Sequence, residues 1–413
     1  MPAPRKGTLT IAGSGIASIG HITLETLSHI QGADKIHYAV TDPATEAFIL
    51  EKSKDSSSCF DLGIYYDKNK MRYETYVQMC EVMLRDVRGG HNVLGIFYGH
   101  PGVFVSPTHR AIALARDEGY TAKMLPGISA EDYMFSDLGF DPAFPGCMTQ
   151  EATILLVRGR KLDPSVHNII WQVGGVGVDT MVFDNANFYI LVDRLEEDLG
   201  PDHKVVHYIG AVLPQSTAVI DEFTVAGLRK EEVVKQITTV STFYLPPRTL
   251  LHADQDMVQK LGLSDSLGKR AVHVYPRTKW INAESPSPPA YGPFERAAVD
   301  RLADHTIPSN HLFLRGSQAL RQLMTDLALQ PTLRARYVAD PTSVLDDVTG
   351  MSAEETFALT LRHPAPVFKV MRATGEAIAN GVPTLGEIAE SANSSIAGSS
   401  CALIGFFVVV LEI

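Results

Sequence analysis

The stretch of sequence that decides the fold is Val93-Leu94-Gly95-Ile96-Phe97-Tyr98-Gly99-His100-Pro101-Gly102-Val103-Phe104. Its first half is a continuous apolar run, which is typical of a strand buried on both faces of a parallel sheet. Its second half places two glycines around a proline, so the backbone there can come close to a ligand. Open α/β sheets bind ligands at the carboxyl ends of their strands. The stretch therefore predicts a ligand-binding loop, 98–104, at a sheet edge.

Two other loops follow the same pattern. Pro126-Gly127-Ile128-Ser129-Ala130 comes after a predicted strand at Ala122–Leu125, and two such loops at neighbouring strand ends indicate a pocket. Gly13-Ser14-Gly15 follows the predicted strand Thr8–Ala12, but Ser18 replaces the third glycine of the dinucleotide fingerprint. A close strand-to-helix turn explains those glycines as well as a nucleotide phosphate does.

Residues 7–250 alternate strand and helix patterns, which predicts an α/β domain. Strands are predicted at Thr8–Ala12, Lys35–Val40, Val93–Tyr98, Ala122–Leu125, Ala152–Val157, Asn187–Val192, Val205–Ile209 and Val240–Leu245. Helices are predicted at Ile19–His29, Met71–Val87 and Pro107–Glu118. Ser106 is the expected N-cap of the last of these, and Ser129 of a further helix with Glu131 and Asp132 in its first turn.

The pattern changes after Pro246-Pro247, which predicts the end of the α/β domain. A loop or extended crossing is expected around Pro286, Pro288, Pro289 and Pro293. Helices then dominate, at Ser317–Leu329, Ala353–Leu361 and Val367–Ala379, and Asn380-Gly381 is a typical stop for the last. Ser352 and Glu355 stand at capping-box spacing before the second. The sequence predicts a helical accessory domain between the α/β domain and the C-terminal tail.

Composition excludes several classes of protein. The 413 residues are 45% apolar and 20% charged, as in ordinary globular proteins. A formal net charge of −11 argues against a nucleic-acid partner, which favours a basic face. The four cysteines and 14 histidines show no metal-ligand or redox spacing, so we expect no metal site and reduced thiols in a cytoplasmic protein.

The last residues, Cys401-Ala402-Leu403-Ile404-Gly405-Phe406-Phe407-Val408-Val409-Val410-Leu411-Glu412-Ile413, form an apolar tail. A small, polar run before it, within Ala389–Ser400, has the composition of a flexible tether. The tail is too short for a membrane span, which needs roughly 20 apolar residues. A final buried strand, an aggregation-prone segment and a peptide substrate carried in cis all fit its pattern.

Together, Gly13-Ser14-Gly15, His21-Ile22-Thr23 and the loops 98–104 and 126–130 resemble the tetrapyrrole methylase superfamily. That resemblance covers roughly residues 7–250 and implies a two-lobed α/β fold that uses S-adenosylmethionine and releases S-adenosylhomocysteine. The whole chain, with its helical segment and apolar tail, is similar to the borosin precursors of fungi. Members of that family N-methylate backbone amides of their own C-terminus, and a helical clasp interlocks two subunits.

The borosin resemblance implies a catalytic set at Tyr66, Arg72, Tyr76 and Tyr98. Arg72 and Tyr76 are i and i+4, so they share one face of the predicted helix. A guanidinium favours the charged form of a neighbouring phenol, and a phenolate is a plausible base for a weakly acidic amide. A positive group could also stabilise a developing imidate. A surface Tyr–Arg pair on an amphipathic helix is the simpler alternative.

The cofactor contacts implied by the resemblance come from both halves of the α/β domain. They are Tyr98, His100, Val103, Phe104, Ser129 and Ala130, followed by Gln172, Tyr208, Ala211, Ser241 and Thr242. His100 is equally well explained as a loop residue that hydrogen-bonds backbone. We expect S-adenosylmethionine to bind among these residues.

The resulting prediction is a self-modifying methyltransferase with four parts. They are a methyltransferase domain at 1–250, a clasp domain at 251–380, a leader at 381–400 and a substrate tail at 401–413. The expected methylated residues are Ala402, Leu403, Ile404, Gly405, Phe406, Phe407, Val408, Val409 and Val410, with Glu412 and Ile413 as core or follower. We expect a homodimer, in which each subunit modifies its own tail or the tail of its partner. A peptidase is expected to release the product, and no nucleic acid or membrane is expected as a partner.

Two other functions fit parts of the sequence. One is a methyltransferase of a separate small molecule such as a tetrapyrrole, with the tail packed as a strand. The other is a cofactor-binding scaffold without activity, whose apolar tail docks a partner.

Overall fold

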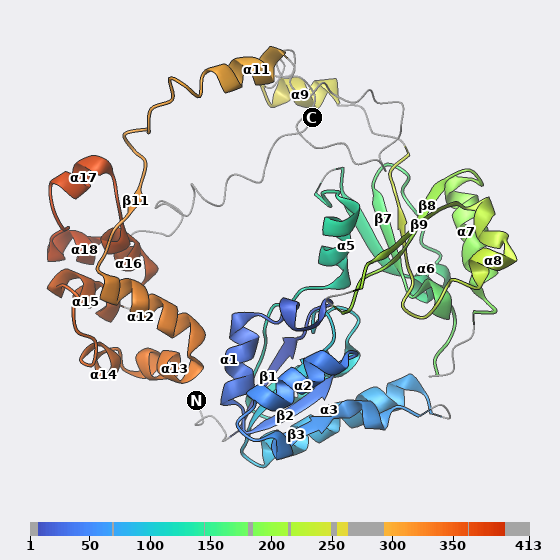
Figure 1. Cartoon of the computed structure of the whole chain (residues 1–413), viewed down its shortest axis with the longest axis horizontal. Helices are drawn as coiled ribbons and strands as arrows, with labels where there is room; N and C mark the ends of the chain where they lie inside the picture. Colours follow the sequence, from blue (N-terminus) through green and yellow to red (C-terminus); the bar gives the residue numbers. More distant parts are fainter. Residues whose placement is uncertain are drawn as a thin grey trace. The chain divides into compact units, whose positions relative to one another are not determined.

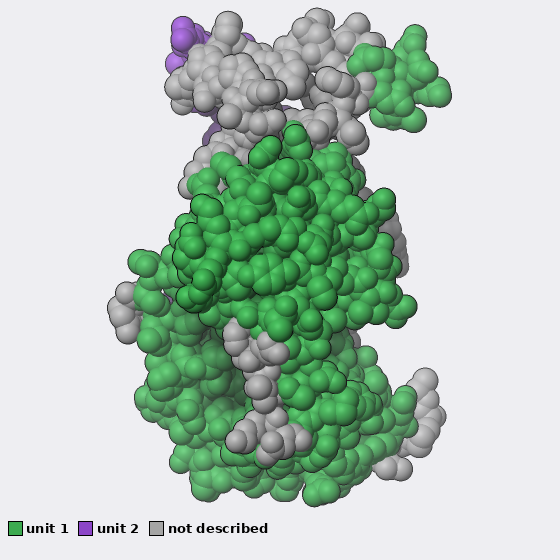
Figure 2. Space-filling model, turned by 90° about the vertical axis from the view of Figure 1, so that its right-hand side faces the viewer, with its two compact units in different colours: residues 1–269, 273–288 green, residues 270–272, 289–413 purple. Residues whose placement is uncertain are grey.

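The computed structural model of this chain describes residues 7–67, 70–143, 145–180, 185–213, 216–248, 254–262, 293–361 and 363–392. The chain divides into two compact units, residues 1–269 with 273–288 and residues 270–272 with 289–413 (Figure 2). The first unit contains two lobes, each built on a five-stranded sheet (Figure 1). Within the described residues, no helix combines the length and apolarity needed to cross a membrane.

The first lobe is built on a parallel sheet, as the continuous apolar runs predict. Its strand order is β3-β2-β4-β1-β5, with strands β1 (Thr8–Gly13), β2 (Lys35–Ala39), β3 (Cys59–Asp61), β4 (Asn92–Phe97) and β5 (Thr121–Met124). The two inner strands β1 and β4 are buried along almost their whole length. The register sets Gly13 opposite Phe97 and Ile11 opposite Met124, so the loops after β1, β4 and β5 leave the sheet at one edge.

Helices cover both faces of this sheet. Helices α3 (Arg72–Arg88) and α4 (Ser106–Asp117) pack on one face, and α1 (Leu24–Gly32) and α2 (Pro43–Lys52) pack on the other. Short 3-10 turns occupy Ser18–His21, Ser56–Ser58 and Leu62–Tyr65, so the predicted helix Ile19–His29 is in fact a turn followed by α1. The N-cap prediction for Ser106 is wrong: Val105 precedes the helix, and the Thr108 hydroxyl donates to the Val105 carbonyl at 2.7 Å.

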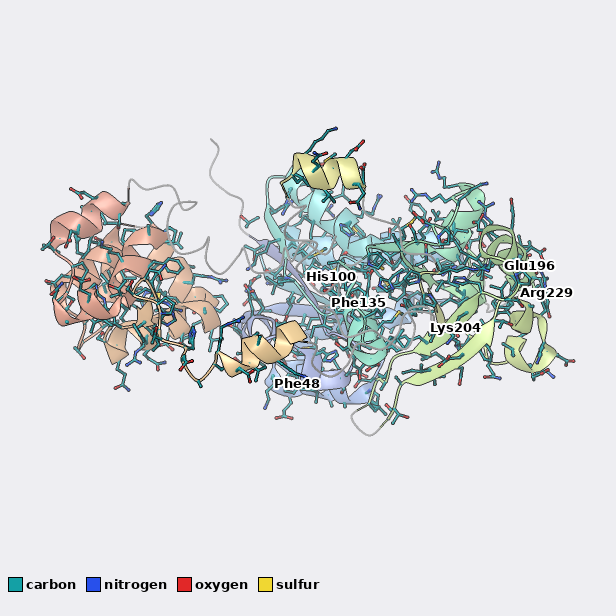
Figure 3. All side chains as sticks on the ribbon, turned by 90° about the horizontal axis from the view of Figure 1, so that it is seen from above. Phe48, His100, Phe135, Glu196, Lys204 and Arg229 are labelled. Atoms are coloured by element: carbon teal, nitrogen blue, oxygen red, sulfur yellow. The ribbon has the colours of Figure 1, made fainter. Side chains whose placement is uncertain are left out.

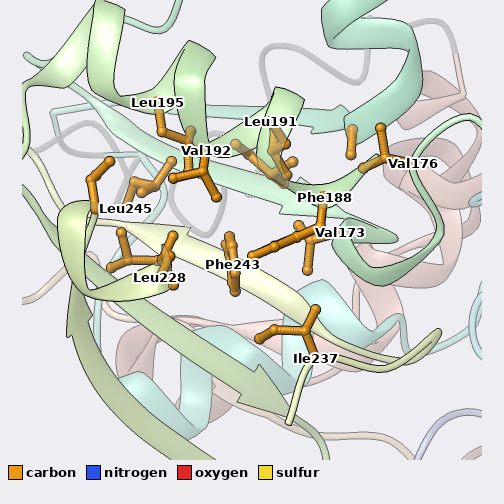
Figure 4. Close-up of a cluster of buried hydrophobic side chains, with 14 of the residues drawn as sticks. Val173, Val176, Phe188, Leu191, Val192, Leu195, Leu228, Ile237, Phe243 and Leu245 are labelled. Atoms are coloured by element: carbon orange, nitrogen blue, oxygen red, sulfur yellow. The ribbon is translucent and has the colours of Figure 1, made fainter. Parts of the chain in front are cut away.

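The second lobe contains a mixed sheet in the order β6-β7-β10-β8-β9. Its strands are β6 (Cys147–Glu151), β7 (His167–Trp171), β8 (Lys204–Ile209), β9 (Val219–Thr224) and β10 (Thr242–Leu245). Only β6 and β7 run parallel; β10 pairs antiparallel with both β7 and β8. Helix α5 (Ala130–Leu138) packs on one face, and an apolar cluster with α6 (Ala152–Val157) and α7 (Phe188–Leu199) fills the other (Figure 4). The 3-10 turns Val173–Gly175 and Ala226–Arg229, and helices α8 (Glu231–Val234) and α9 (Gln255–Lys260), complete the described part of this unit.

Two strand predictions in this lobe are wrong. Residues 152–157 form α6, because the Glu151 carboxylate accepts from the backbone N–H groups of Thr153 and Ile154 and begins a helix there. Residues 187–192 belong to the start of α7, whose buried residues Phe188, Leu191, Val192, Leu195 and Leu199 recur at helical spacing. A six-residue apolar window is too short to separate that spacing from a buried strand.

The second unit is mainly helical. Its elements are α11 (Pro293–Asp300), β11 (Phe313–Leu314), α12 (Gln318–Leu329), α13 (Pro331–Ala339), α14 (Thr342–Leu345), α15 (Ala353–Thr360), α16 (Pro364–Met371), β12 (Arg372–Ala373), α17 (Gly375–Ala379) and α18 (Leu385–Ser391). The helices predicted at 317–329 and 353–361 are confirmed, as is the Ser352–Glu355 capping box. The single helix predicted at 367–379 is wrong, because β12 pairs with β11 and separates α16 from α17.

The predicted leader contains a helix. Thr384 and Glu387 form a capping box that begins α18, and Ile388 is fully buried in the core of the second unit. Residues 389–391, predicted as part of the flexible tether, therefore belong to a packed helix. Residues 393–413, with the rest of the tether and the whole substrate tail, lie outside the described residues, as do Pro286, Pro288 and Pro289.

Candidate active site

Three loops pack closely at the carboxyl edge of the first sheet. The backbone N–H of Gly15 donates to the Gly99 carbonyl at 3.2 Å, and the Gly99 N–H donates back to Gly15 at 3.0 Å. A Cβ atom on Gly13 would lie 2.2 Å from the Gly99 carbonyl oxygen and 2.8 Å from the Pro101 ring, and one on Gly127 would lie 3.1 Å from the same ring. These glycines therefore let the three loops pack on one another. Close packing explains Gly13 and Gly15 without a bound nucleotide phosphate.

Two histidines hold the 98–104 loop. The Gly102 N–H donates to His100 Nδ1 at 2.9 Å, and the Gly102 carbonyl lies 2.9 Å from His109 Nε2. The Val103 N–H closes a turn onto the His100 carbonyl at 3.2 Å. The ring of His100 thus binds backbone, as one of its two sequence interpretations expected. His100 lies well apart from the Arg229–Glu196 ion pair on the outside of the second lobe (Figure 3).

Residues predicted from the second lobe share one edge of its sheet. Gln172 follows β7, Ala211 follows β8, and Ser241 precedes β10, whose Thr242 pairs with Tyr208. Because β10 is antiparallel to both neighbours, its start lies beside their carboxyl ends. The five predicted cofactor residues of this lobe, Gln172, Tyr208, Ala211, Ser241 and Thr242, are therefore neighbours in space.

The two edges meet. The rings of Phe104 and Trp171, one from each lobe, have centroids 5.6 Å apart. A Cβ atom on Gly210 would lie 3.3 Å from Ile16 in the loop after β1 and 3.2 Å from Tyr133 of α5. The Tyr133 ring also packs edge-on against His21 at 5.1 Å. The fold thus brings the predicted residues of both lobes to one place.

Two of the predicted cofactor residues have unusual backbones. Phe104 and Gln172 both have φ of +56°, in the left-handed region that favours glycine. Strained non-glycine residues of this kind concentrate at functional sites. Phe104 is nevertheless half exposed as a residue, at 51%, and its ring lies beside that of Trp171.

The strain at Phe104 gives a stability prediction. We expect the free energy of unfolding of Phe104→Gly to exceed that of Phe104→Ala by about 0.5–1 kcal/mol. The left-handed backbone costs alanine roughly 1–2 kcal/mol and costs glycine almost nothing. Glycine gives back part of this difference because its unfolded chain has more conformational entropy. Urea unfolding measures the difference. At Val103, which has no positive φ, the order of the glycine and alanine variants should reverse; the same order at both positions would contradict strain at Phe104.

Tyr66, Arg72 and Tyr76 form a cluster, as the resemblance implied. Desolvation and the neighbouring Tyr76 hydroxyl raise the pKa of Tyr66 to about 12, while the charge of Arg72 acts in the opposite direction. Tyr66 is therefore a neutral phenol at pH 7. Arg72 favours the charged form of Tyr66, as expected, but desolvation outweighs its charge and raises the pKa of Tyr66.

Arg72 also connects the two lobes. It is the first residue of α3, and its backbone N–H donates to the Asp179 carbonyl at 2.8 Å. Its guanidinium Nη2 donates to the Val178 carbonyl, and Met71 forms a bridge with Thr180. The charge of Arg72 also acts on Tyr66 at this junction.

Tyr98 lies among a different set of groups. Burial raises its pKa to about 12, and Asp42 and Tyr133 add to the shift. Tyr98 and Tyr133 in turn contribute to the raised pKa of Tyr208, whose hydroxyl donates to Asp137 at 2.7 Å. The structure thus separates the predicted catalytic residues into the Tyr66–Arg72–Tyr76 cluster and Tyr98 with its own neighbours.

Two other predicted residues, Ser129 and Ser241, form hydrogen bonds within the fold. Ser129 accepts from the backbone of Glu131 and Asp132, and Asp132 returns the bond at 2.7 Å, so the predicted cap is confirmed as a capping box that places Ala130 at the start of α5. Ser241 is fully buried, and its hydroxyl lies 2.7 Å from His207 Nε2.

Sequence reasoning missed three residues that face the predicted set: Tyr133, Asp137 and Trp171. Tyr133 and Asp137 lie one turn apart on α5, and the helical spacing was the signal that could have found them. Trp171 ends β7, a strand that was not predicted; its run His167–Trp171 is fully buried but includes His167 and Asn168, which hid the apolar pattern.

Comparison with known proteins agrees with this geometry. The family model for Tetrapyrrole (Corrin/Porphyrin) Methylases matches residues 8–212, and that for the Borosin biosynthesis clasp domain matches residues 290–412. A methyltransferase/ribosomally synthesized type I borosin cyclic peptide precursor of Cerrena unicolor is 60% identical over 414 residues, 100% of both chains. The chain belongs to the borosin precursor methyltransferase family.

Two further members of the borosin family are similar over most of their length. A type I precursor of Mycena rosella is 61% identical over 393 residues, 95% of this chain and 96% of that protein. The gymnopeptides precursor of Gymnopus fusipes is 48% identical over 360 residues, 86% of this chain and 85% of that protein. Membership confirms the predicted order of a tetrapyrrole-methylase domain and a clasp domain, and makes the chain a methyltransferase. It favours the borosin precursor function over methylation of a separate small molecule.

Proposed function

We propose that this methyltransferase transfers methyl groups from S-adenosylmethionine to backbone amide nitrogens of its own C-terminal segment, within residues 402–410. The observation that carries the proposal is the meeting of the two lobes at Phe104 and Trp171, 5.6 Å apart. That contact brings the loops 98–104 and 126–130, which we expect to hold the cofactor, beside the edge of the second sheet at Gln172, which we expect to complete the site. The segment 402–410 offers main-chain nitrogens and no side-chain nucleophile.

The residues at this junction fit S-adenosylmethionine. The rings of the half-exposed Phe104 and the partly exposed Tyr98 are aromatic surfaces of the kind that attract a cation. The left-handed backbone at Gln172 and the closely packed glycine loops lie at the same junction. When bound, the cofactor supplies an electrophilic methyl group on a positively charged sulfur. Tyr98, His100, Val103, Phe104, Ser129 and Ala130 would hold it from one lobe, and Gln172, Tyr208, Ala211 and Thr242 from the other, with the buried Ser241 behind them.

Arg72 and the tyrosines address the low reactivity of an amide. The amide nitrogen is a poor nucleophile because its lone pair is delocalised into the carbonyl. The permanent charge of Arg72 would stabilise negative charge that develops on the amide oxygen as the N–H is lost. Tyr76 or Tyr98 would take that proton. In the resting enzyme Tyr98 is a neutral phenol, so in this role it would first give up its own proton.

Several finer parts of the proposal rest on the family and the sequence. They are a homodimer with interlocked clasps, a tail that enters its own or its partner's site, S-adenosylhomocysteine as product, a releasing peptidase and the cytoplasm as location. The residue boundaries 1–250, 251–380, 381–400 and 401–413 also remain part of the proposal.

Mass spectrometry of the purified chain tests this function. After incubation with S-adenosylmethionine, the C-terminal peptide should gain mass in steps of one CH2 group, and fragmentation should place each methyl on a backbone nitrogen between Ala402 and Val410. A reaction with excess S-adenosylhomocysteine is the control and should show slower gain. A tail that gains no mass, in a protein that binds the donor, would favour the scaffold alternative.

A further inference from the structure

A Ser–His–Asp array lies inside the second lobe. Ser241 and His207 are 0% and 1% exposed, and their Oγ and Nε2 atoms are 2.7 Å apart. On the other side of the ring, His207 Nδ1 lies 3.4 Å from a carboxylate oxygen of Asp221, the residue directly opposite on β9. The ring packs between Phe223 and Phe243.

The hydrogen bonds of this array have one consistent direction. A carboxylate only accepts, so Asp221 keeps the proton on His207 Nδ1 and leaves Nε2 as an acceptor. The Ser241 hydroxyl then donates to Nε2. Its oxygen is free to accept the backbone N–H of Thr238, which lies 2.9 Å away.

Ser241 is too deeply buried to contact a ligand as it stands, and its hydroxyl acts on the chain itself. It ties down the turn 238–241, since the Ser241 N–H also donates to the Thr238 carbonyl at 3.1 Å. The same turn packs closely against the loop after β7, since a Cβ atom on Gly174 would lie 2.2 Å from the Thr238 carbonyl oxygen. Gly174 is two residues beyond Gln172, whose left-handed backbone needs support from its surroundings.

We propose that Asp221, His207 and Ser241 form a positioning relay that holds the turn 238–241 against the turn 172–175 and so sets the affinity of the enzyme for its cofactor. The inference rests on the proposed function, because it takes the edge at Gln172 as part of the cofactor site. It changes the expected role of Ser241 from a cofactor contact to a positioning residue. Outer groups that orient a binding set commonly influence affinity in this way.

Calorimetric titration with S-adenosylhomocysteine tests the relay. Ser241→Ala and His207→Phe should each weaken its binding about tenfold, since both leave buried partners without a hydrogen bond. His207→Gln, which keeps an amide donor and acceptor between the same partners, should bind within about threefold of the wild type. Glu222→Gln, beside Asp221 on β9 but paired with Lys204 at the surface, is the matched control and should bind normally.

Stability and kinetics separate positioning from general damage. A purely structural role would lower the melting temperature and the active fraction but leave the dissociation constant of the folded protein unchanged. The relay predicts a raised KM for S-adenosylmethionine with a nearly unchanged kcat. Normal affinity in folded Ser241→Ala and His207→Phe would overturn it.

If those two variants do not fold, Asp221→Asn decides, because Asp221 is partly exposed. A two- to threefold loss of affinity is expected there, and wild-type affinity would overturn the relay. Failure of the wild-type protein itself to bind S-adenosylhomocysteine would instead contradict the proposed cofactor.

Discussion

Replacing Arg72 by alanine is expected to slow methylation of the C-terminal segment about 100- to 1000-fold, the usual cost of removing a group that stabilises a developing oxyanion. Arg72 lies beside Tyr66 and Tyr76 and is anchored to the second lobe through the carbonyls of Val178 and Asp179. The alanine variant keeps the backbone bond to Asp179, so the lobes stay connected while the charge is lost. Intact-mass measurement over a time course gives the rate.

Three further variants make the Arg72 result specific. Tyr76→Phe should show a comparable loss if Tyr76 takes the amide proton, and Tyr98→Phe if Tyr98 does. Arg85→Ala is the matched control, because Arg85 lies on the same helix with its side chain 74% exposed and paired with Glu81. A full set of methyl groups on the Arg72→Ala protein, formed at the wild-type rate, would remove Arg72 from the mechanism.

Gly13→Ala is expected to destabilise the carboxyl edge of the first sheet strongly. The new Cβ would lie 2.2 Å from the backbone oxygen of Gly99, and backbone cannot rotate away as a side chain can. We expect a loss of about 3 kcal/mol or more in the free energy of unfolding, at or above the usual range for overpacking. To relieve this clash, the loops after β1 and β4 would have to move apart. We therefore expect the affinity for S-adenosylhomocysteine to fall together with the stability.

Gly32→Ala is the matched control for this prediction. Gly32 ends α1, and a Cβ atom there would meet no other atom within 4 Å. That variant should be as stable as the wild type or more stable by up to about 1 kcal/mol. Equal stability of the Gly13 and Gly32 variants in chemical unfolding would show that the loops can separate without cost.

The first lobe could be predicted from sequence because its local patterns agree with its packing. Its inner strands are mostly apolar and its loops leave one edge, so the positions of Tyr98, His100 and Ser129 followed from their places after predicted strands. The second lobe could not. There the fully buried strand β7 contains the polar residues His167 and Asn168, which a sequence pattern would assign to the surface. Hydrogen bonds to distant residues, such as that between His167 and Tyr244 at 2.8 Å, allow these side chains to be buried.

The same reason explains which parts of the site were missed. The left-handed backbone at Gln172 and the burial of Ser241 depend on contacts with residues far away in the chain, such as the Thr238 carbonyl against Gly174. Family resemblance placed both residues at the site, but only the packing separates a residue that faces a ligand from one that supports it.

Helix α18 has a consequence for how the substrate segment is presented. Because Ile388 is buried in the core of the second unit, the reach of the tail is measured from Ala392, just after α18, and not from residue 381. Ala402 is ten residues further along, and at no more than about 3.6 Å per residue it can travel no further than about 36 Å from that anchor. The length of 393–401 therefore limits which amides the proposed reaction can reach, and insertions or deletions there should move the pattern of modified positions along the tail.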